Sequence, residues 1–366
     1  MVGGGEGAFI GQVHRIAAEL DGEAELVCGA FASNPERSRR SGQSLYRLHA
    51  DRCYDNYEAL FQLEANRADA MDFVVIATPN HTHYSIARAA LEGGFHVVCD
   101  KPLAMSVLEG EQLQNVVKAS GLKFALTHNY TGYPMVREAR SLVNSGVLGK
   151  IRRVSCEYLQ GWLHERAPDD NKQAAWRTDP ARSGAAGCFG DIGSHAENLT
   201  RFITGLEIES LAADLTAFVP GRLLDDDGNV LLRFKGGAKG VISASQIAVG
   251  KENDLSIQVY GETGGLEWRQ SDANSLIVRW PDKPYEVRRT GWAGTSPESQ
   301  AASRIPPGHP EGYLEGFAEL YRNFYKDLSD DGGDYPNLDD GIAGMRFIES
   351  VVESTKQNSA WVDLAS

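Results

Sequence analysis

Positive charge is scarce in this sequence: 36 Lys and Arg stand against 50 Asp and Glu, giving a formal net charge of −14 over 366 residues. A protein that binds nucleic-acid phosphates needs a basic surface, so we expect no nucleic-acid partner. No uninterrupted apolar run reaches the length of a membrane span, and glycines stand where a signal peptide would carry its apolar core. We therefore expect no membrane partner and no secretion.

Cysteine is also scarce, and the cysteines follow none of the spacings typical of disulfide-rich or zinc-binding proteins. The five cysteines are odd in number, widely scattered and never spaced as CxxC: Cys28, Cys53, Cys99, Cys156 and Cys188. This pattern fits neither a disulfide framework nor a structural zinc site. We expect a cytoplasmic protein without a bound metal.

The length exceeds what one hydrophobic core usually supports, so two domains are expected. In the N-terminal part, apolar segments at 25–31, 73–77, 95–99 and 124–127 alternate with helical patterns near 13–20, 55–66, 80–92 and 105–120. Continuous apolar strands separated by helices indicate a parallel sheet covered on both faces. We predict a Rossmann-type dinucleotide-binding domain over 1–130 and a substrate-binding and oligomerisation domain over 131–366.

A glycine-rich turn opens this first domain. It reads as GxGxxA from Gly3 or as GxGxxxG from Gly5 to Gly11, and either form lets backbone N–H groups approach a pyrophosphate at a helix N-terminus. The expected phosphate-binding residues are Gly3, Gly5, Gly7, Ala8, Phe9 and Ile10. The strand before the turn has only two or three residues, which is short for a central position; either it begins upstream or it is truncated here.

The end of the 25–31 segment bears on the choice of cofactor. An acidic residue there would bond the adenosine ribose hydroxyls, but this chain has Ser33, Asn34 and Arg37 instead. Ser33 and Arg37 suit a 2′-phosphate, whereas Ser33 or Asn34 suits a diol. NAD and NADP both remain open.

After residue 150 the pattern changes to strands with polar alternation, at 151–162, 208–219, 229–235, 239–248, 254–260, 264–269 and 284–289. Short turns between them predict an open, mostly antiparallel sheet. Helical patterns beginning near Asp191 and at 312–328 and 338–356 are expected to back it, and the C-terminal helices are free to pack on the first domain. The predicted class is thus α/β followed by α+β.

Two motifs place ionisable side chains where they could take part in catalysis. In the first, the 95–99 strand runs directly into Asp100-Lys101-Pro102, and a lysine at a parallel strand end is expected to be a reactive-site residue. In the second, Asp191 and His195 are four apart, so they share one face at the start of a helix. The alternative for the second motif is a capping aspartate followed by a structural histidine.

Several further side chains suit a sugar or polyol. Tyr158, Gln160 and Trp162 alternate onto one strand face, which fits a sugar or, equally, a sheet–sheet interface. Trp176 and Arg177 lie in a long connection at about 163–189 that is expected to be irregular. Asn129 and Tyr130 follow the last parallel strand, where ligands gather; we expect Asn129 to bind the cofactor and Tyr130 the substrate, although Tyr130 also suits a hinge contact.

The glycine turn with Gly11-x-x-His14, the turn Thr78-Pro79-Asn80-x-x-His83, the Asp100-Lys101-Pro102 step and Gly190-Asp191-Ile192-Gly193-Ser194-His195 together resemble the Gfo/Idh/MocA oxidoreductase family over nearly the whole chain. The resemblance implies a nicotinamide held near Thr78, Pro79, Asn80, His83 and Asp100. It also implies that Lys101 reaches the reacting oxygen, that His195 is the general acid/base and that Asp191 orients the substrate. Asp100 replaces the usual Glu of the motif. The open sheet of such proteins commonly forms the interface of a homodimer or homotetramer.

The expected function is therefore NAD(P)-dependent hydride transfer at a hydroxyl-bearing carbon of a cyclic polyol or sugar, of inositol or pyranose type. One alternative is a retained cofactor used for redox-assisted glycoside cleavage or elimination. Another is a dinucleotide-sensing protein without catalysis. A zinc-dependent alcohol dehydrogenase using His81, His83, Asp191 and His195 is disfavoured because Lys101 already supplies the positive charge.

Overall fold

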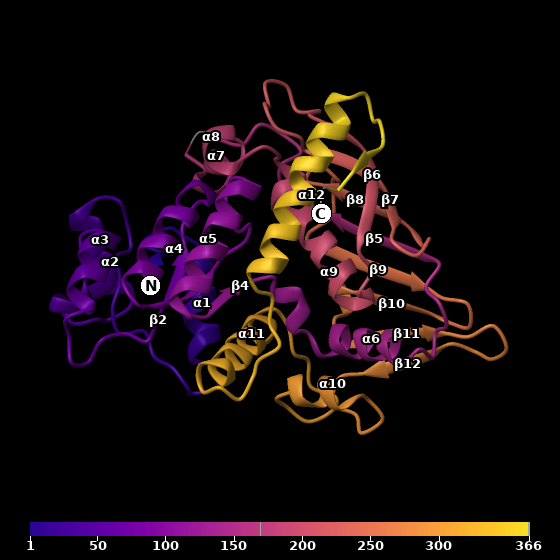
Figure 1. Cartoon of the computed structure of the whole chain (residues 1–366), viewed down its shortest axis with the longest axis horizontal. Coiled ribbons are helices and arrows are strands. Elements are labelled where there is room, and N and C mark those ends of the chain that lie inside the picture. Colours follow the sequence, from indigo (N-terminus) through magenta and orange to yellow (C-terminus); the bar gives the residue numbers. More distant parts are fainter. Residues whose placement is uncertain (169, 365–366) are drawn as a thin grey trace. The chain divides into compact units, whose positions relative to one another are not determined.

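The computed structural model describes residues 1–168 and 170–364, and these form two compact units. The first unit contains Met1–His128 and Phe317–Met345; the second contains Asn129–Gly316 and the chain from Arg346 onwards. Figure 1 labels the elements of both.

The first unit is built on a four-stranded parallel sheet in the order β1-β2-β3-β4. Its strands are β1 (Val2–Gly3), β2 (Phe73–Ala77), β3 (His96–Cys99) and β4 (Phe124–Leu126). The N-terminal helices are α1 (Ile10–Glu19), α2 (Pro35–Leu45), α3 (Tyr57–Glu64), α4 (His83–Glu92) and α5 (Val107–Ser120). The strands are almost wholly buried, as expected for a parallel sheet covered by helices. The predicted Rossmann architecture is confirmed.

Local sequence explains the ends of these helices. The Ser106 hydroxyl caps α5 by accepting a hydrogen bond from the Glu109 N–H, and α5 ends at Gly121, whose φ of 70° suits glycine. The Asn34 and Asn56 side chains cap α2 and α3 in the same way. Two further helices, α11 (Tyr313–Leu328) and α12 (Leu338–Lys356), contribute the segment Phe317–Met345 to this unit.

The strand predicted at 25–31 is wrong. Only Gly29 and Ala30 pair there, through isolated bridges to Cys53 and Val2. The strand beside this segment, β1, has just two residues, so no longer ladder forms. The N–H of Phe31 donates instead to the Ser38 hydroxyl at 2.8 Å.

The second unit is built on a nine-stranded sheet in the order β12-β11-β10-β9-β5-β8-β7-β6-β13. The strands are β5 (Arg153–Leu159), β6 (Ile208–Thr216), β7 (Asp227–Phe234), β8 (Lys239–Ser245), β9 (Asp254–Tyr260), β10 (Gly265–Arg269), β11 (Ser275–Arg279), β12 (Glu286–Arg289) and β13 (Val362–Asp363). Every pair is antiparallel except the central pair β5–β8. The mostly antiparallel sheet is confirmed.

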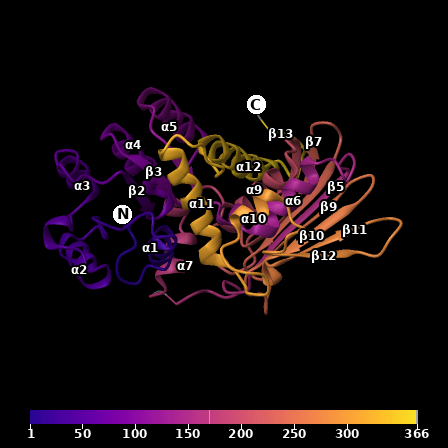
Figure 2. The same ribbon diagram turned by 90° about the horizontal axis from the view of Figure 1, so that it is seen from below.

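Two helices, α6 (Pro134–Asn144) and α9 (Ser194–Thr204), lie on one face of this sheet. The second unit also contains the short helices α7 (Lys172–Arg177), α8 (Pro180–Ser183) and α10 (Pro297–Ala302). Figure 2 shows α6 and α9 beside the strands, and α9 contacts β5 while α6 contacts β10 and β11. Strand β7 alternates buried and exposed residues along its length, so its other face is open.

Some boundaries differ from those predicted. The strand expected to reach residue 162 ends at Leu159, because the following chain pairs with the turn after β8: the Gly161 N–H donates to the Lys251 carbonyl at 2.8 Å. Gln160 and Trp162 therefore lie beyond the strand. The connection expected to be irregular contains α7 and α8, and the prediction did not include α2, α6 and β11.

All five cysteines are free and buried. Among the helices of residues 1–168 and 170–364, none combines the length and the hydropathy of a membrane-spanning segment.

Candidate active site

The glycine turn packs directly against the first helix. A Cβ on Gly11, in α1, would lie 2.3 Å from the Gly4 Cα, and Gly4 itself has φ of +73°. A side chain at either position would push the helix away from the turn. Both glycines are therefore needed for the close approach that a dinucleotide phosphate requires. Around them lie the predicted residues Gly3, Gly5, Gly7, Ala8, Phe9 and Ile10, the last being the first residue of α1.

The predicted ribose-binding residues flank this turn. Ser33 and Asn34 are exposed, and the Asn34 side chain accepts a hydrogen bond from the Arg37 N–H at 2.9 Å. The Arg37 guanidinium donates to the Glu6 carbonyl of the glycine turn at 2.7 Å. Arg37 thus stabilises the turn itself, through one N–H group of its guanidinium.

The Asp100 carboxylate organises the lysine motif at the end of β3. Its Oδ1 accepts hydrogen bonds from the Lys101 N–H at 2.8 Å and from the Thr127 hydroxyl at 3.1 Å. Burial opposes ionisation of Asp100, but the neighbouring His14 and Lys101 outweigh it and lower the pKa of this carboxyl. Asp100 is therefore an anion at neutral pH, and it holds the backbone of Lys101.

His14, which the sequence placed in the family motif without a role, lies behind Asp100. Its Nε2 is 3.9 Å from Asp100 Oδ2, and its Nδ1 is 2.8 Å from the Tyr321 hydroxyl. His14 is fully buried, and its ring also lies edge-on to Phe317 at 5.2 Å. Tyr321, His14 and Asp100 thus form a buried polar chain that leads to Lys101.

His83 ties the turn after β2 to the lysine motif. It is fully buried, with Nδ1 at 2.7 Å from the Pro102 carbonyl and Nε2 at 2.8 Å from the Thr78 carbonyl. Pro79 and the 96 % buried Asn80 continue the same turn. Both ring nitrogens of His83 face the protein backbone, so it positions the two loops relative to each other.

In the second unit, Asp191 does not start a regular α-helix as the spacing suggested. It lies in a π-helical turn, Phe189–Gly193, which precedes α9. A Cβ on Gly193 would lie 2.7 Å from the Phe189 ring, so the tight turn needs that glycine. Asp191 Oδ2 accepts hydrogen bonds from Arg177 Nε at 3.1 Å and from Gln246 Nε2 at 2.9 Å.

His195, in the first turn of α9, lies among tyrosine rings. Its ring centroid is 4.9 Å from that of Tyr130 and 6.1 Å from that of Tyr158. The hydroxyls of Tyr130 and Tyr158 are 2.6 Å apart. Burial raises the pKa of both phenols, and the charge of Asp191 adds to this at Tyr158, so both stay neutral near pH 7.

Asn253, which the sequence did not suggest, links the remaining predicted residues. Its Oδ1 accepts from Gln160 Nε2 at 2.6 Å and from the Tyr158 hydroxyl at 3.3 Å. Gln160 Oε1 in turn accepts from the indole N–H of Trp162 at 2.8 Å. The network therefore runs from Tyr130 to Trp162.

Arg177 contacts two tryptophan rings and also binds Asp191. Its guanidinium carbon lies 4.2 Å from the Trp176 ring centroid and 5.9 Å from that of Trp162, while its Nε holds Asp191. All the substrate-binding residues predicted in this unit therefore belong to one connected cluster. Gln246 and Asn253 join it, and neither lies in a recognisable motif.

The glycine turn fits a dinucleotide cofactor, because Cβ atoms at Gly4, Gly5 and Gly11 would lie within 3 Å of neighbouring backbone, so only glycines allow this tight path. A separate observation concerns the second unit. In the second unit, Asn129 is 99 % buried, yet its Nδ2 has no hydrogen-bond partner within the described chain. A buried amide donor without an acceptor is costly in an empty protein and suits a ligand oxygen.

Family models match both halves of the chain. Residues 1–128 match the oxidoreductase family, NAD-binding Rossmann fold, and residues 136–267 match the GFO/IDH/MocA C-terminal domain. The sequence is 34 % identical to the uncharacterized oxidoreductase YfiI of Bacillus subtilis, over 99 % of this chain and 95 % of that protein. It is 29 % identical to levoglucosan dehydrogenase of Pseudarthrobacter phenanthrenivorans, over 80 % and 79 % of the two chains.

Solved structures of oxidoreductases superpose on this chain over nearly its whole length. An inositol dehydrogenase homolog from Azotobacter vinelandii, complexed with NADH and myo-inositol, superposes with a TM-score of 0.93 at 34 % identity, covering 99 % of this chain and 96 % of that one. An oxidoreductase from Sinorhizobium meliloti superposes with a TM-score of 0.90 at 44 % identity, covering 99 % and 98 %.

Proposed function

Because this chain belongs to the Gfo/Idh/MocA family of oxidoreductases, we propose that it transfers a hydride between a nicotinamide cofactor and a hydroxyl-bearing carbon of a cyclic polyol or sugar. The first unit is then the cofactor-binding domain and the second the substrate-binding domain. The observation that carries the proposal is the cluster around Asp191 and His195. It combines a carboxylate, an imidazole, aromatic rings and amides, which are the groups that bind a polyhydroxylated ring.

The roles of the three chemical groups follow from their surroundings. Lys101, whose backbone is held by the Asp100 carboxylate, would stabilise the negative charge that develops on the reacting oxygen. His195 would take the hydroxyl proton, since an imidazole titrates near neutral pH. Asp191, held by Arg177 and Gln246, would accept a hydrogen bond from a neighbouring hydroxyl and fix the ring. The cofactor would supply the hydride acceptor.

We propose NAD rather than NADP as this acceptor. Arg37, which follows the expected ribose-binding residues Ser33 and Asn34, donates a guanidinium N–H to the Glu6 carbonyl and so stabilises the glycine turn. The carboxylate of Glu6 also lies in the turn, paired with Arg40 at 3.1 Å, and an anion there disfavours a 2′-phosphate. The Azotobacter homolog was solved with NADH.

The test is reduction of NAD and, in parallel, NADP across a panel of inositols, aldoses and anhydrosugars at mildly alkaline pH. Turnover with NAD and at least one compound is expected. Lys101→Met should lower kcat by a factor on the order of 100 or more while the Kd for NAD stays within a few-fold, because only charge stabilisation of the reacting oxygen is lost. The matched control is Lys118→Met, since Lys118 is an exposed lysine on α5.

Two outcomes would contradict the proposal. Lys101→Met at the wild-type rate would remove the lysine from the mechanism. Substrate conversion without net NAD reduction would point to a retained cofactor and away from a dehydrogenase.

We also propose that the open sheet face mediates homo-oligomerisation. Leu231 points outward from β7 with 52 % of its surface exposed, and Val287 on β12 is 50 % exposed. Such apolar groups on an uncovered sheet favour contact with a second copy. Leu231→Asp should lower the molar mass measured by light scattering, and an unchanged mass would place the interface elsewhere.

A further inference from the structure

Three consecutive N–H groups at the start of the π-helical turn donate to a single residue, Asp225. The Gly187 N–H donates to its Oδ1 at 2.6 Å and the Phe189 N–H to its Oδ2 at 2.8 Å. The Cys188 N–H donates to the Asp225 carbonyl at 2.9 Å. The first N–H groups of a helix have no acceptor within the helix, so a partner must come from elsewhere. Here it comes from the loop that joins β6 to β7.

The contact between this loop and the π-helical turn is tight. A Cβ on Gly187 would lie 2.4 Å from the Asp225 carbonyl oxygen. A Cβ on Gly228, in β7, would lie 2.8 Å from the Phe189 ring, and Phe189 is fully buried. The path of the turn is therefore fixed by Asp225 on its backbone and by β7 on its first side chain.

The same loop also supports a side chain that holds Asp191. The Gln246 N–H donates to the Asp226 carbonyl at 2.8 Å, and the Gln246 amide donates to Asp191 Oδ2 at 2.9 Å. Asp226 is fully buried, and its carboxylate accepts from the N–H groups of Phe218 and Val219 at 2.9 and 3.0 Å. The end of the loop is thus held in place from within, and it fixes both the backbone that carries Asp191 and an amide that binds its carboxylate.

We propose that Asp225 is a positioning residue for Asp191, and that the affinity for the polyol or sugar depends on the Asp225 carboxylate. The inference rests on the proposed function, in which Asp191 accepts a hydrogen bond from the substrate. Asp225→Asn offers one acceptor oxygen and an NH2 group, so one of the two N–H donors would face another donor. The turn would then shift, and Asp191 would move with it.

The experiment measures kcat/KM for the most active compound of the polyol and sugar panel, and the Kd for NAD. Asp225→Asn should lower kcat/KM about tenfold, the effect of weakening one hydrogen bond to a charged group. The Kd for NAD should stay unchanged. The matched control is Asp227→Asn on β7, which removes the same charge two residues along the chain but none of the hydrogen bonds to residues 187–189, and should leave both values unchanged.

A double-mutant cycle with Asp191→Asn separates positioning from a general structural role. Once Asp191 has lost its charge, Asp225→Asn should change kcat/KM by less than about twofold, because the two residues act through one interaction. A further tenfold loss in that background, or no loss in the wild-type background, would overturn the proposal.

Amide hydrogen exchange of a peptide covering 186–193 gives a readout that needs no activity. Exchange should be faster in Asp225→Asn and unchanged in Asp227→Asn, and equal rates in both variants would overturn the anchoring role. If the protein binds myo-inositol without oxidising any compound, only the proposed redox function fails, and the same cycle is measured on the Kd for myo-inositol by calorimetry. A protein that neither oxidises nor binds any compound of the panel would overturn both proposals.

Discussion

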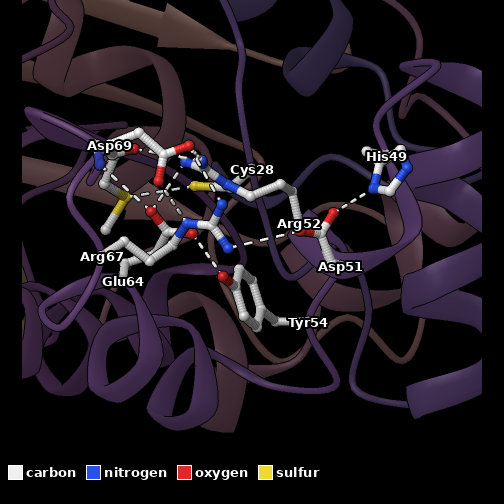
Figure 3. A network of polar contacts seen from close by, with 9 residues as sticks. Cys28, His49, Asp51, Arg52, Tyr54, Glu64, Arg67 and Asp69 are labelled. Atoms are coloured by element: carbon white, nitrogen blue, oxygen red, sulfur yellow. Dashed lines mark hydrogen bonds and ion pairs between the residues drawn. The ribbon is translucent and has the colours of Figure 1, made fainter.

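The buried ion pair between Arg52 and Glu64 gives the sharpest stability prediction (Figure 3). Glu64 is fully buried and accepts three hydrogen bonds: from Arg52 Nη2 at 2.9 Å, from the Tyr54 hydroxyl at 2.5 Å and from the Met71 N–H at 3.3 Å. Glu64→Gln keeps the shape but removes the charge and turns an NH2 group toward at least one donor. Arg52 is then left as a buried cation whose remaining partner is Asp69, which is 67 % exposed.

Removing one member of a buried ion pair typically costs about 3–5 kcal/mol. Asp69 retains part of the interaction with Arg52, so we expect the lower end, about 3 kcal/mol. With a denaturant dependence of about 2 kcal/mol per M, the urea midpoint of the first unit should fall by about 1.5 M. Arg67 pairs with the same Asp69 but near the surface, with side-chain exposures of 30 % and 67 %, where an ion pair contributes little. Arg67→Gln is therefore the matched control, expected to leave the midpoint nearly unchanged.

Two probes separate the units in this assay. All six tryptophans lie in the second unit, so their fluorescence reports that unit alone. Amide hydrogen exchange of peptides covering 52–76 reports the first. Faster exchange in Glu64→Gln is expected there. A midpoint shift below about 0.3 M, or one equal to that of Arg67→Gln, would refute the reasoning that this pair stabilises the unit.

Three further predictions concern the first unit. Gly11→Ala should weaken NAD binding at least tenfold by equilibrium titration, because its Cβ would lie 2.3 Å from the Gly4 Cα; unchanged affinity would show that the turn yields. Tyr321→Phe leaves the buried Nδ1 of His14 without the hydroxyl that lies 2.8 Å away, so the free energy of unfolding in urea should fall by about 1–3 kcal/mol. The pH profile of kcat should also shift, and a wild-type profile would exclude a link from His14 to Lys101. Burial lowers the pKa of His96, whose Nδ1 accepts a hydrogen bond from a backbone N–H at 2.9 Å. The neutral ring's contribution to stability is therefore complete above pH 6.5 and is lost as the pH falls through the folded-state pKa. The decline in urea midpoint from pH 7 to 5 should be shallower in His96→Gln, and equal slopes would contradict this.

The sequence predicted the parts of the fold that depend on local pattern. The apolar runs at 73–77 and 254–260 are strands over those same residues, because continuous or alternating burial leaves a direct trace in the chain. The run at 25–31 is also mostly apolar, yet it forms only two bridges, since its neighbour β1 offers two residues to pair with. Pairing partners are a property of the tertiary structure and not of the segment.

The same distinction applies to the candidate site. Lys101, Asp191 and His195 stand in spaced motifs, and the structure sets each among polar or aromatic groups. Gln246 and Asn253 have no such motif. They reach Asp191 and Gln160 only because β8 and β9 flank β5 in the sheet, so no local pattern could have indicated them.

The parallel pairing of β5 with β8 has a consequence for how such a protein changes over evolutionary time. Parallel neighbours need a crossover connection, and the chain between these two strands contains first the segment 160–207 and then β6 and β7, which extend the same sheet beyond β8. The segment 160–207 holds the π-helical turn, α9 and the residues Arg177, Asp191 and His195, and both of its ends are anchored in strands of the sheet, β5 and β6. Lengthening a closed loop costs little, about 0.6 kcal/mol for each doubling of its length. The loops within 160–207 can therefore be extended or shortened between relatives, and new substrate preferences can arise without any strand changing its neighbour.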